Sequence, residues 1–258
     1  MSGFPSLMPV DDAFKRVMER VGTMSLGYEE VGLDEALGRV VAKDLLSPID
    51  IPPFDRSAME GYAVISSDTT GATPTDPVEL KIIGRSEAGS RPEDLPEVFS
   101  GSAVEIFTGG PIPKGADAVV MVEYCRRVGG VVQIQKPASP YQNVSRRGED
   151  FSRGEPLIRR GVRIKPWHIG AIASTNIDRI VVYRRPKVGI LSTGSELKEV
   201  GEEAEPGEII NSSKPMLKAL LREMCCEAID LGNVGDDLEA IRARLIDGLK
   251  LCDFLITT

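Results

Sequence analysis

The chain has 258 residues, of which 41% are hydrophobic and 27% are charged, the composition of an ordinary soluble globular protein with room for two domains. Its net charge of −8 argues against broad nucleic-acid binding, and an anionic ligand would need a local cluster of basic residues. The sequence has no run of about 20 apolar residues and no signal-peptide pattern. We therefore expect a cytoplasmic protein that does not enter a membrane.

The cysteines and the histidine show no catalytic or metal-binding pattern. The cysteines are Cys125, Cys225, Cys226 and Cys252. They lack C-x-x-C spacing and a nearby histidine, which predicts free thiols in a reducing compartment. The adjacent Cys225 and Cys226 are sterically awkward to join in a disulfide. The only histidine, His168, is interpreted as a surface or packing residue.

The first 142 residues contain a helical start followed by a β-rich region. Apolar residues at helical spacing predict an amphipathic helix over residues 10–21. Extended segments around residues 30–33 and 39–45 flank a brief helical piece. From residue 47 onward, prolines and glycines separate short β-prone runs, which are 62–65, 78–84, 103–107, 118–122 and 131–134. Such regular short strands predict a small β-barrel or sandwich.

The remaining chain changes from a polar segment to a βαβαβ pattern. Residues 143–154 are polar and basic and are interpreted as a linker or exposed loop. A short helix over 166–174 and a strand over 179–183 follow. After residue 185 we predict strands at 188–191, 228–231 and 254–256, separated by helices around 216–224 and 238–249. This alternation predicts a doubly wound parallel sheet. Because the chain stops just after the third strand, we expect a fragment of a longer protein.

The stretch RRPKVGILSTGSEL, residues 184–197, is the strongest candidate for a ligand-binding edge. Its apolar run has no alternation, as in a strand buried on both faces. The small residues Ser192, Thr193, Gly194 and Ser195 come next. Loops after parallel strands bind ligands in open α/β sheets, and free N–H groups and hydroxyls suit an oxyanion. Glu196 adds a carboxylate for a metal ion or a base edge. The alternative is a simple turn with a solvated glutamate.

Three more loops carry candidate residues. PPFDRSAMEGYAV spans 52–64, FTGGPIPKGADAVVMVE spans 107–123, and Gly-Asp-Asp spans 235–237. Each also has a structural interpretation, as an entry loop, a tight turn or a helix cap. Spacing alone does not establish that the loops meet in space.

Together with NVSRRGED at 143–150, these loops resemble the molybdopterin molybdenumtransferases of molybdenum cofactor synthesis, the MoeA and gephyrin E-domain type. The match is collinear over nearly the whole chain. The resemblance implies insertion of molybdate, or tungstate in archaeal relatives, into adenylylated molybdopterin, with release of AMP and help from Mg²⁺ or a similar ion. No residue looks like an activated nucleophile, which favours electrostatic positioning.

The resemblance also implies the site residues and partners. The implied catalytic residues are Glu60, Thr108, Glu196 and Asp236. Those expected to bind substrate are Ser192, Thr193, Gly194, Ser195, Gly109 and Gly110, and the metal ligands are Glu196 and Asp236. We expect a homodimer, in which Glu60 and Thr108 serve the site of the partner chain, and a MogA- or MoaB-like adenylyltransferase as a further partner.

The implied fold is elongated and multidomain. Residues 1–46 with 143–184 are expected to form a mixed α/β linker domain, and 47–142 an inserted β-barrel-like domain. Residues 185–258 are expected to be the first part of a doubly wound, MogA-like parallel α/β domain that binds molybdopterin.

The sequence departs from the family pattern in three places. Glu60 stands where aspartate is usual, and Ser213 stands where asparagine is usual. The glycine-rich loop expected after Thr258 is absent, so we expect a chain that ends here to be inactive. The rival hypothesis is a scaffold or receptor-binding module like gephyrin's use of this fold, and a weaker one is a regulatory pterin-binding protein.

Overall fold

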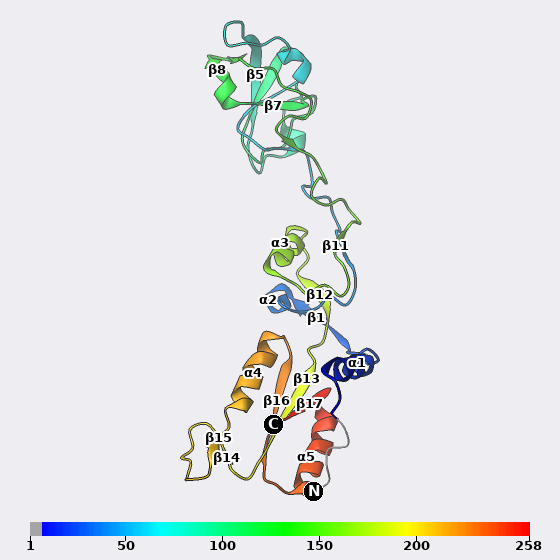
Figure 1. The fold of residues 1–258 in the computed structure, drawn as a ribbon. Helices are drawn as coiled ribbons and strands as arrows, with labels where there is room; N and C mark the ends of the chain where they lie inside the picture. Colours follow the sequence, from blue (N-terminus) through cyan, green and yellow to red (C-terminus); the bar gives the residue numbers. More distant parts are fainter. Residues whose placement is uncertain (1–6) are drawn as a thin grey trace. The chain divides into compact units, whose positions relative to one another are not determined.

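The computed structural model describes residues 7–258 and divides into two compact units (Figure 1). The first unit combines the described residues up to Asp44 with Ile158–Ala173 and Ile177–Thr258. The second combines Leu45–Leu157 with Ser174–Asn176. The finer division into three domains stays a prediction.

The second unit is built on a curled six-stranded sheet of order β7-β4-β6-β5-β9-β8. Its strands are β4 (Gly61–Val64), β5 (Val78–Ser86), β6 (Ser102–Ile106), β7 (Ala118–Met121), β8 (Cys125–Val128) and β9 (Val131–Ile134). Neighbouring strands are antiparallel except β5 and β6. The five predicted strands are confirmed. β8, which the sequence analysis missed, is an edge strand with a mostly exposed Cys-Arg-Arg-Val sequence.

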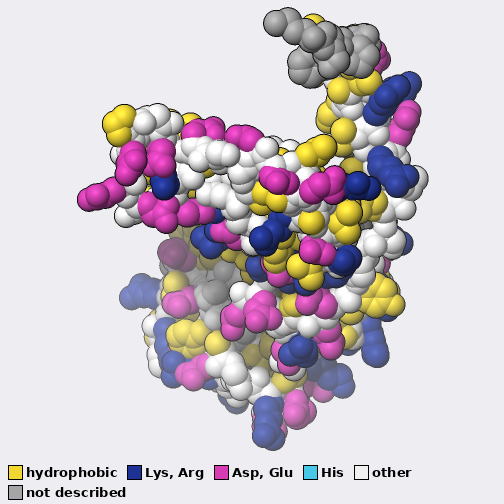
Figure 2. All heavy atoms as spheres, turned by 90° about the horizontal axis from the view of Figure 1, so that it is seen from below, with side chains coloured by type: hydrophobic (Ala, Val, Ile, Leu, Met, Phe, Trp, Pro, Cys, Tyr) yellow, Lys and Arg dark blue, Asp and Glu magenta, His cyan; other side chains and the backbone are white. Residues whose placement is uncertain are grey.

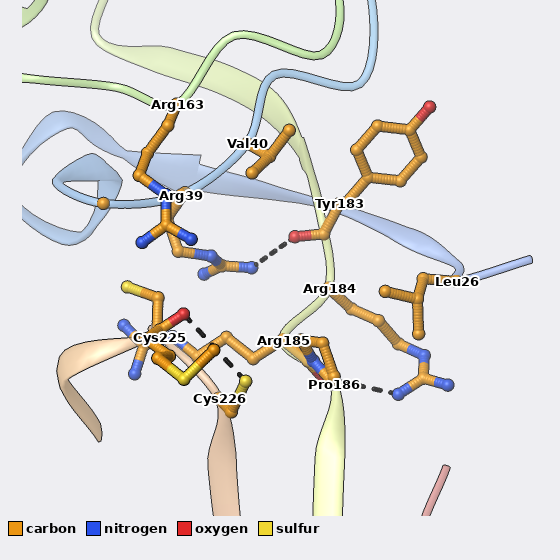
Figure 3. A pocket seen from close by; sticks show the side chains of 12 residues that line it. Leu26, Arg39, Val40, Arg163, Tyr183, Arg184, Arg185, Pro186, Cys225 and Cys226 are labelled. Atoms are coloured by element: carbon orange, nitrogen blue, oxygen red, sulfur yellow. Dashed lines mark hydrogen bonds between the residues drawn. The ribbon is translucent and has the colours of Figure 1, made fainter. Parts of the chain in front are cut away.

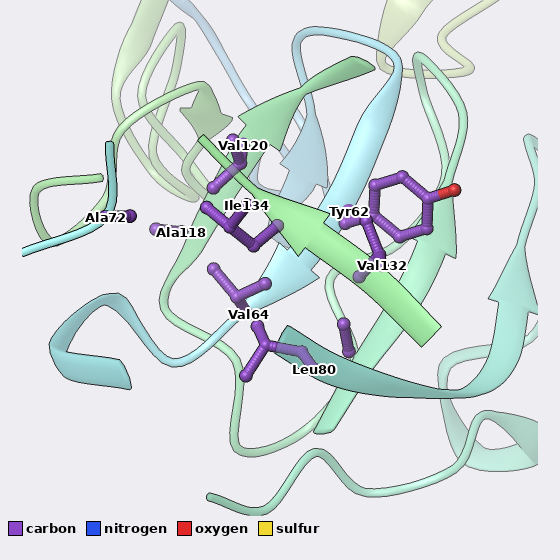
Figure 4. Close-up of a cluster of buried hydrophobic side chains, with 9 residues drawn as sticks. Tyr62, Val64, Ala72, Leu80, Ala118, Val120, Val132 and Ile134 are labelled. Atoms are coloured by element: carbon purple, nitrogen blue, oxygen red, sulfur yellow. The ribbon is translucent and has the colours of Figure 1, made fainter. Parts of the chain in front are cut away.

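Both faces of this sheet are covered, which explains why β4 is buried along its whole length. Tyr62 and Val64 pack into a cluster with Leu80 on one face (Figure 4). Ala63 points to the opposite face, where a second cluster contains Val104. Side chains alternate between faces along a strand, so β4 serves both clusters. Each large apolar side chain buried in this way contributes about 1.5–3 kcal/mol.

Short elements complete the second unit. They are β2 (Leu45–Leu46), β3 (Arg56–Ser57), β10 (Val144–Ser145), β11 (Pro156–Ile158) and the 3-10 helices η1 (Ser66–Thr69), η2 (Pro92–Asp94) and η3 (Val122–Tyr124). β3 pairs with β10, and β2 pairs with β11. The prediction that 143–154 is only a linker or exposed loop is therefore wrong for β10. The pairing was missed because two-residue strands have no periodicity to detect.

The first unit contains α1 (Val10–Val21), the antiparallel pair β1 (Tyr28–Gly32) and β12 (Arg179–Tyr183), α2 (Leu33–Ala36) and α3 (Pro166–Ser174). The predicted amphipathic α1 is confirmed, with Asp11 and Asp12 in its first turn. It has no buried residue, and Phe14 and Val17 on its apolar side are 66% and 58% exposed.

The rest of the first unit is a parallel sheet of order β16-β13-β17. Its elements are β13 (Lys187–Thr193), β16 (Glu227–Val234), β17 (Phe254–Thr257), α4 (Ser213–Glu223) and α5 (Leu238–Leu251), with the small pair β14 (Leu197–Lys198) and β15 (Ile209–Ile210) between β13 and α4. Leu221 of α4 packs against Val188 and Ile190. Gly248 of α5 lies against Leu231 and Leu255.

These contacts place α4 and α5 on opposite faces of the sheet, in agreement with Figure 1. From β13 the chain passes through α4 to β16, on one side of β13. From β16 it then passes through α5 to β17, on the other side of β13. The direction of winding therefore reverses between β13 and β17. Open α/β sheets bind ligands at such a switch point.

Figure 2 shows Lys and Arg side chains interspersed with Asp and Glu on the face that it displays. That face therefore has no extended patch of one charge. In the described part of the chain, no helix combines the length and the apolar character that crossing a membrane requires. All four cysteines are free, as predicted.

A partly buried ion pair at Asp253 ties the parallel sheet to the strand before it. The Asp253 carboxylate accepts hydrogen bonds from Arg184 Nη1 at 2.8 Å and Nη2 at 2.5 Å, and from the Lys187 N–H at 2.8 Å. The hydrogen bond from Arg184 is the main cause that lowers the pKa of Asp253. Its contribution to stability is thus present above the ordinary pKa near 3.9 and is lost as the pH falls.

We expect Asp253→Asn to lower the free energy of unfolding by about 1–2 kcal/mol at neutral pH, because the charged hydrogen bonds weaken. Urea unfolding of both proteins should show this difference near neutral pH and a smaller one near pH 3. An equal difference at both pH values would show that the Asp253 charge contributes nothing.

Candidate active site

The candidate site begins where β13 ends and the chain turns at Gly194. The φ of Gly194 is 145°, and a Cβ at this position would lie 2.6 Å from Glu196 Oε2. The Glu196 side chain therefore folds back over Gly194, and the positive φ of this residue favours glycine. The Gly194 N–H donates to the Val234 carbonyl at 2.9 Å, which holds the turn against the end of β16.

A reciprocal pair of hydrogen bonds joins the loops after β13 and β16. The Asp236 N–H donates to Ser195 Oγ at 3.0 Å, and the Ser195 N–H donates to Asp236 Oδ2 at 3.3 Å. We call this pair of bonds the Ser195–Asp236 clasp. It places the carboxylates of Asp236 and Glu196 at the same Gly194–Ser195 peptide. The structure thus brings together two loops that spacing alone does not connect.

The hydroxyls of Ser192 and Thr193 are engaged within the protein. Ser192 is fully buried, and its Oγ accepts from Asn211 Nδ2 at 2.7 Å and contacts the Thr258 hydroxyl at 3.0 Å. Thr193 Oγ1 donates to the Thr258 carbonyl at 3.0 Å. Both residues therefore support the turn from within the sheet. Their assignment to substrate binding stays a prediction.

Sequence reasoning missed two buried polar residues beneath the turn. Asn211 is 3% exposed, and its Nδ2 also donates to Asn233 Oδ1 at 3.1 Å. Its Oδ1 accepts from the Lys214 N–H at 3.2 Å, whereas Ser212, the N-cap residue of α4, makes no side-chain cap. Lys214 is 3% exposed and forms ion pairs with Glu199 and with Asp230. The sequence feature that could have pointed to these two residues is the polar Asn-Ser-Ser-Lys run at the start of α4.

The second unit carries the other predicted residues on two joined loops. The Gly109 N–H donates to the Ser57 carbonyl at 2.8 Å, and the Ser57 N–H donates to the Gly110 carbonyl at 2.9 Å. These bonds connect the loop that carries Thr108 with the segment that leads to Glu60. Both Thr108 and Glu60 are exposed. Their catalytic roles stay predictions.

The donor atoms at the turn fit a cation that arrives with an anionic substrate. Residues 7–258 contain no group of three or more His, Cys, Asp or Glu side chains arranged to hold a metal ion. Mg²⁺ usually takes one or two protein carboxylates and completes its shell with water and substrate oxygens. Glu196 and Asp236, both exposed beside one peptide, match that ligand set.

Comparison with known proteins identifies the family. Residues 8–176 match the family model described as the MoeA N-terminal region, domains I and II. The chain belongs to the MoeA family. Residues 189–258, which include the turn and the clasp, match the model of a probable molybdopterin binding domain. The candidate site therefore lies within the segment that this second model covers.

Similar proteins carry names from the same biosynthesis. A molybdopterin molybdenumtransferase of Haemophilus influenzae is 36% identical over 98% of this chain and 61% of its own length. A putative molybdopterin biosynthesis protein of Methanocaldococcus jannaschii is 37% identical over 98% and 64%. A solved MoeA structure from Pyrococcus horikoshii OT3 is 36% identical, with a TM-score of 0.89 over 98% of this chain and 66% of that one. The chain thus spans about three fifths of the length of these relatives.

Proposed function

We propose that this MoeA-family chain acts in molybdenum cofactor biosynthesis, in the insertion of molybdate or tungstate into adenylylated molybdopterin with release of AMP. The observation that carries the proposal is the Ser195–Asp236 clasp, which holds two carboxylates at the carboxyl ends of β13 and β16, the ligand-binding edge of an open α/β sheet. The match of residues 189–258 to a probable molybdopterin binding domain supports the same ligand class.

The turn binds anions through its backbone and offsets their charge through a cation. In the described part of the chain, the N–H groups of Glu196 and Gly235 have no hydrogen-bond acceptor and are available to an oxyanion. Mg²⁺ held by Glu196 and Asp236 would neutralise the phosphate oxygens of the substrate. The two carboxylates position that charge, and the Ser195–Asp236 clasp keeps the turn from opening. Catalysis in this scheme is electrostatic positioning without a covalent intermediate.

Further features of the proposal come from the family resemblance. We propose that the protein forms a homodimer and that a MogA- or MoaB-like adenylyltransferase supplies the activated substrate. We also propose catalytic roles for Glu60 and Thr108. A MogA-like fold for the molybdopterin-binding region and a cytoplasmic location are parts of the same proposal.

The test is an AMP-release assay on the natural full-length protein with adenylylated molybdopterin, molybdate and Mg²⁺. We expect release of AMP that depends on molybdate and yields the molybdenum-loaded cofactor. A parallel reaction without molybdate is the control. A folded protein that releases no AMP above this control would overturn the proposal and favour a non-catalytic scaffold.

A further inference from the structure

A pocket lies in the first unit, where the end of α4 meets the connection between β12 and β13, and none of the residues of the clasped turn lines it. Its volume is about 290 Å³. Figure 3 shows its lining side chains, which include Arg39, Arg163, Arg184, Arg185, Cys225 and Cys226. None of these residues belongs to the proposed active site. The size corresponds to the lower end of small-molecule pockets.

The four arginines give the pocket an excess of positive charge. Arg39 is 6% exposed, pairs with Glu29 and donates to the Tyr183 carbonyl at 2.9 Å. Arg184 is paired with Asp253. Arg163 and Arg185 have no acidic partner among residues 7–258. Two guanidinium groups at one pocket therefore lack a direct ion pair, although Arg185 also borders a neighbouring hollow that is lined by Glu29, Asp34, Glu35 and Glu227.

The remaining walls are mostly apolar. Leu26, Val40, Pro186 and Met224 line the pocket beside the two cysteines. Arginine binds carboxylates and phosphates through charge-assisted, often bidentate hydrogen bonds. Apolar walls next to such groups suit a ligand with a hydrocarbon body. The pocket thus combines an anion-binding side with an apolar side.

The backbone at Cys225 adds an independent observation. Cys225 has φ 64° and ends α4 in a Schellman motif, in which its N–H donates to the Arg222 carbonyl at 3.0 Å and the Cys226 N–H donates to the Leu221 carbonyl at 2.8 Å. This position usually holds glycine, and another residue there costs about 1 kcal/mol. Outliers of this kind point to a role for the side chain.

Gly38 makes room for that side chain. A Cβ on Gly38 would lie 2.7 Å from Cys225 Sγ. Gly38 has φ 77°, which by itself favours glycine, and the absence of a Cβ there leaves room for the Cys225 thiol on the pocket wall.

We propose that this pocket binds a small organic anion, a carboxylate or phosphate group on an apolar body. Arg163 and Arg185 hold the oxyanion, while Met224 and Cys225 contact the body. The proposal is independent of molybdate insertion and concerns a second ligand site in the chain.

The Cys225 thiol provides a direct readout of occupancy. The rate of its alkylation by iodoacetamide is measured by mass spectrometry in the natural full-length protein, with phenyl phosphate, benzoate, inorganic phosphate or benzyl alcohol as the probe. We expect phenyl phosphate or benzoate to slow the reaction at least about fivefold, and inorganic phosphate and benzyl alcohol to protect less. The better of the two aromatic anions identifies the anionic group. Cys252, outside the pocket, is the internal control.

Matched arginine variants make the test specific. Arg163→Gln and Arg185→Gln should each raise about tenfold the concentration of phenyl phosphate that halves the rate of Cys225 alkylation, because each substitution removes a charge-assisted contact. Arg222→Gln, an exposed arginine in the last turn of α4 that does not line the pocket, should leave it unchanged. Calorimetric titration of phenyl phosphate into the same proteins should give the same order. Unslowed alkylation of Cys225 without heat of binding, or equal protection in all variants, would overturn the proposal.

Discussion

Replacing Gly61 with alanine is expected to lower the free energy of unfolding of the second unit by about 3 kcal/mol or more, enough to prevent stable folding in a marginal protein. A Cβ on Gly61 would lie 1.9 Å from the Val120 carbonyl oxygen and 2.8 Å from the Val120 carbonyl carbon. Both atoms belong to the backbone of β7, which pairs directly with β4. The clash cannot be relieved by rotating a side chain, so the ladder between these strands must open.

The matched control is Gly130→Ala in the same unit. Gly130 has open space around its Cα, and its φ is not in the left-handed region. We expect this variant to melt within a few degrees of the wild type. Thermal unfolding followed by circular dichroism compares the two, and equal melting temperatures for both variants would show that the strands move apart without cost.

Asp236→Asn is expected to reduce kcat/KM for AMP release at least about tenfold, or about 1.4 kcal/mol. The asparagine keeps the oxygen that accepts from the Ser195 N–H but removes the charge proposed to hold the cation. The loss should therefore appear in the reaction while the melting temperature stays nearly constant.

The neighbouring Asp237 provides the control for this variant. Its carboxylate caps α5 by accepting from the Ala240 N–H at 2.8 Å. Asparagine caps a helix about as well as aspartate. We therefore expect Asp237→Asn to change kcat/KM by less than about twofold and the free energy of unfolding by only about a few tenths of a kcal/mol. Equal activity losses in the two variants would mean that the loop responds to any loss of negative charge.

The sequence predicted the elements of the α/β region well because long apolar runs and helical spacing report burial directly. The run at 188–191 has no alternation, and β13 is indeed buried on both faces. β8 was missed because an exposed edge strand lacks that signal. The apolar spacing of α1 was also informative about the helix itself, but spacing carries no information about what covers the helix.

The arrangement of the candidate site could be predicted only in part. Glu196 and Asp236 were named from their motifs, but the Ser195–Asp236 clasp depends on the register in which Thr193 lies beside Val234. Register arises from packing across the whole sheet, which local sequence does not encode. Asn211 and Lys214 were overlooked because polar residues at a helix start are usually solvated, whereas here they are buried under the turn.

The most direct test of the proposed active site is Glu196→Gln in the natural full-length protein. The Glu196 carboxylate folds over Gly194, and glutamine preserves its shape while removing its charge. If Glu196 binds the cation or the substrate, kcat/KM for molybdate-dependent AMP release should fall at least about tenfold with little change in melting temperature. A large fall in melting temperature with unaltered activity would show that Glu196 is structural and that the proposed site is wrong.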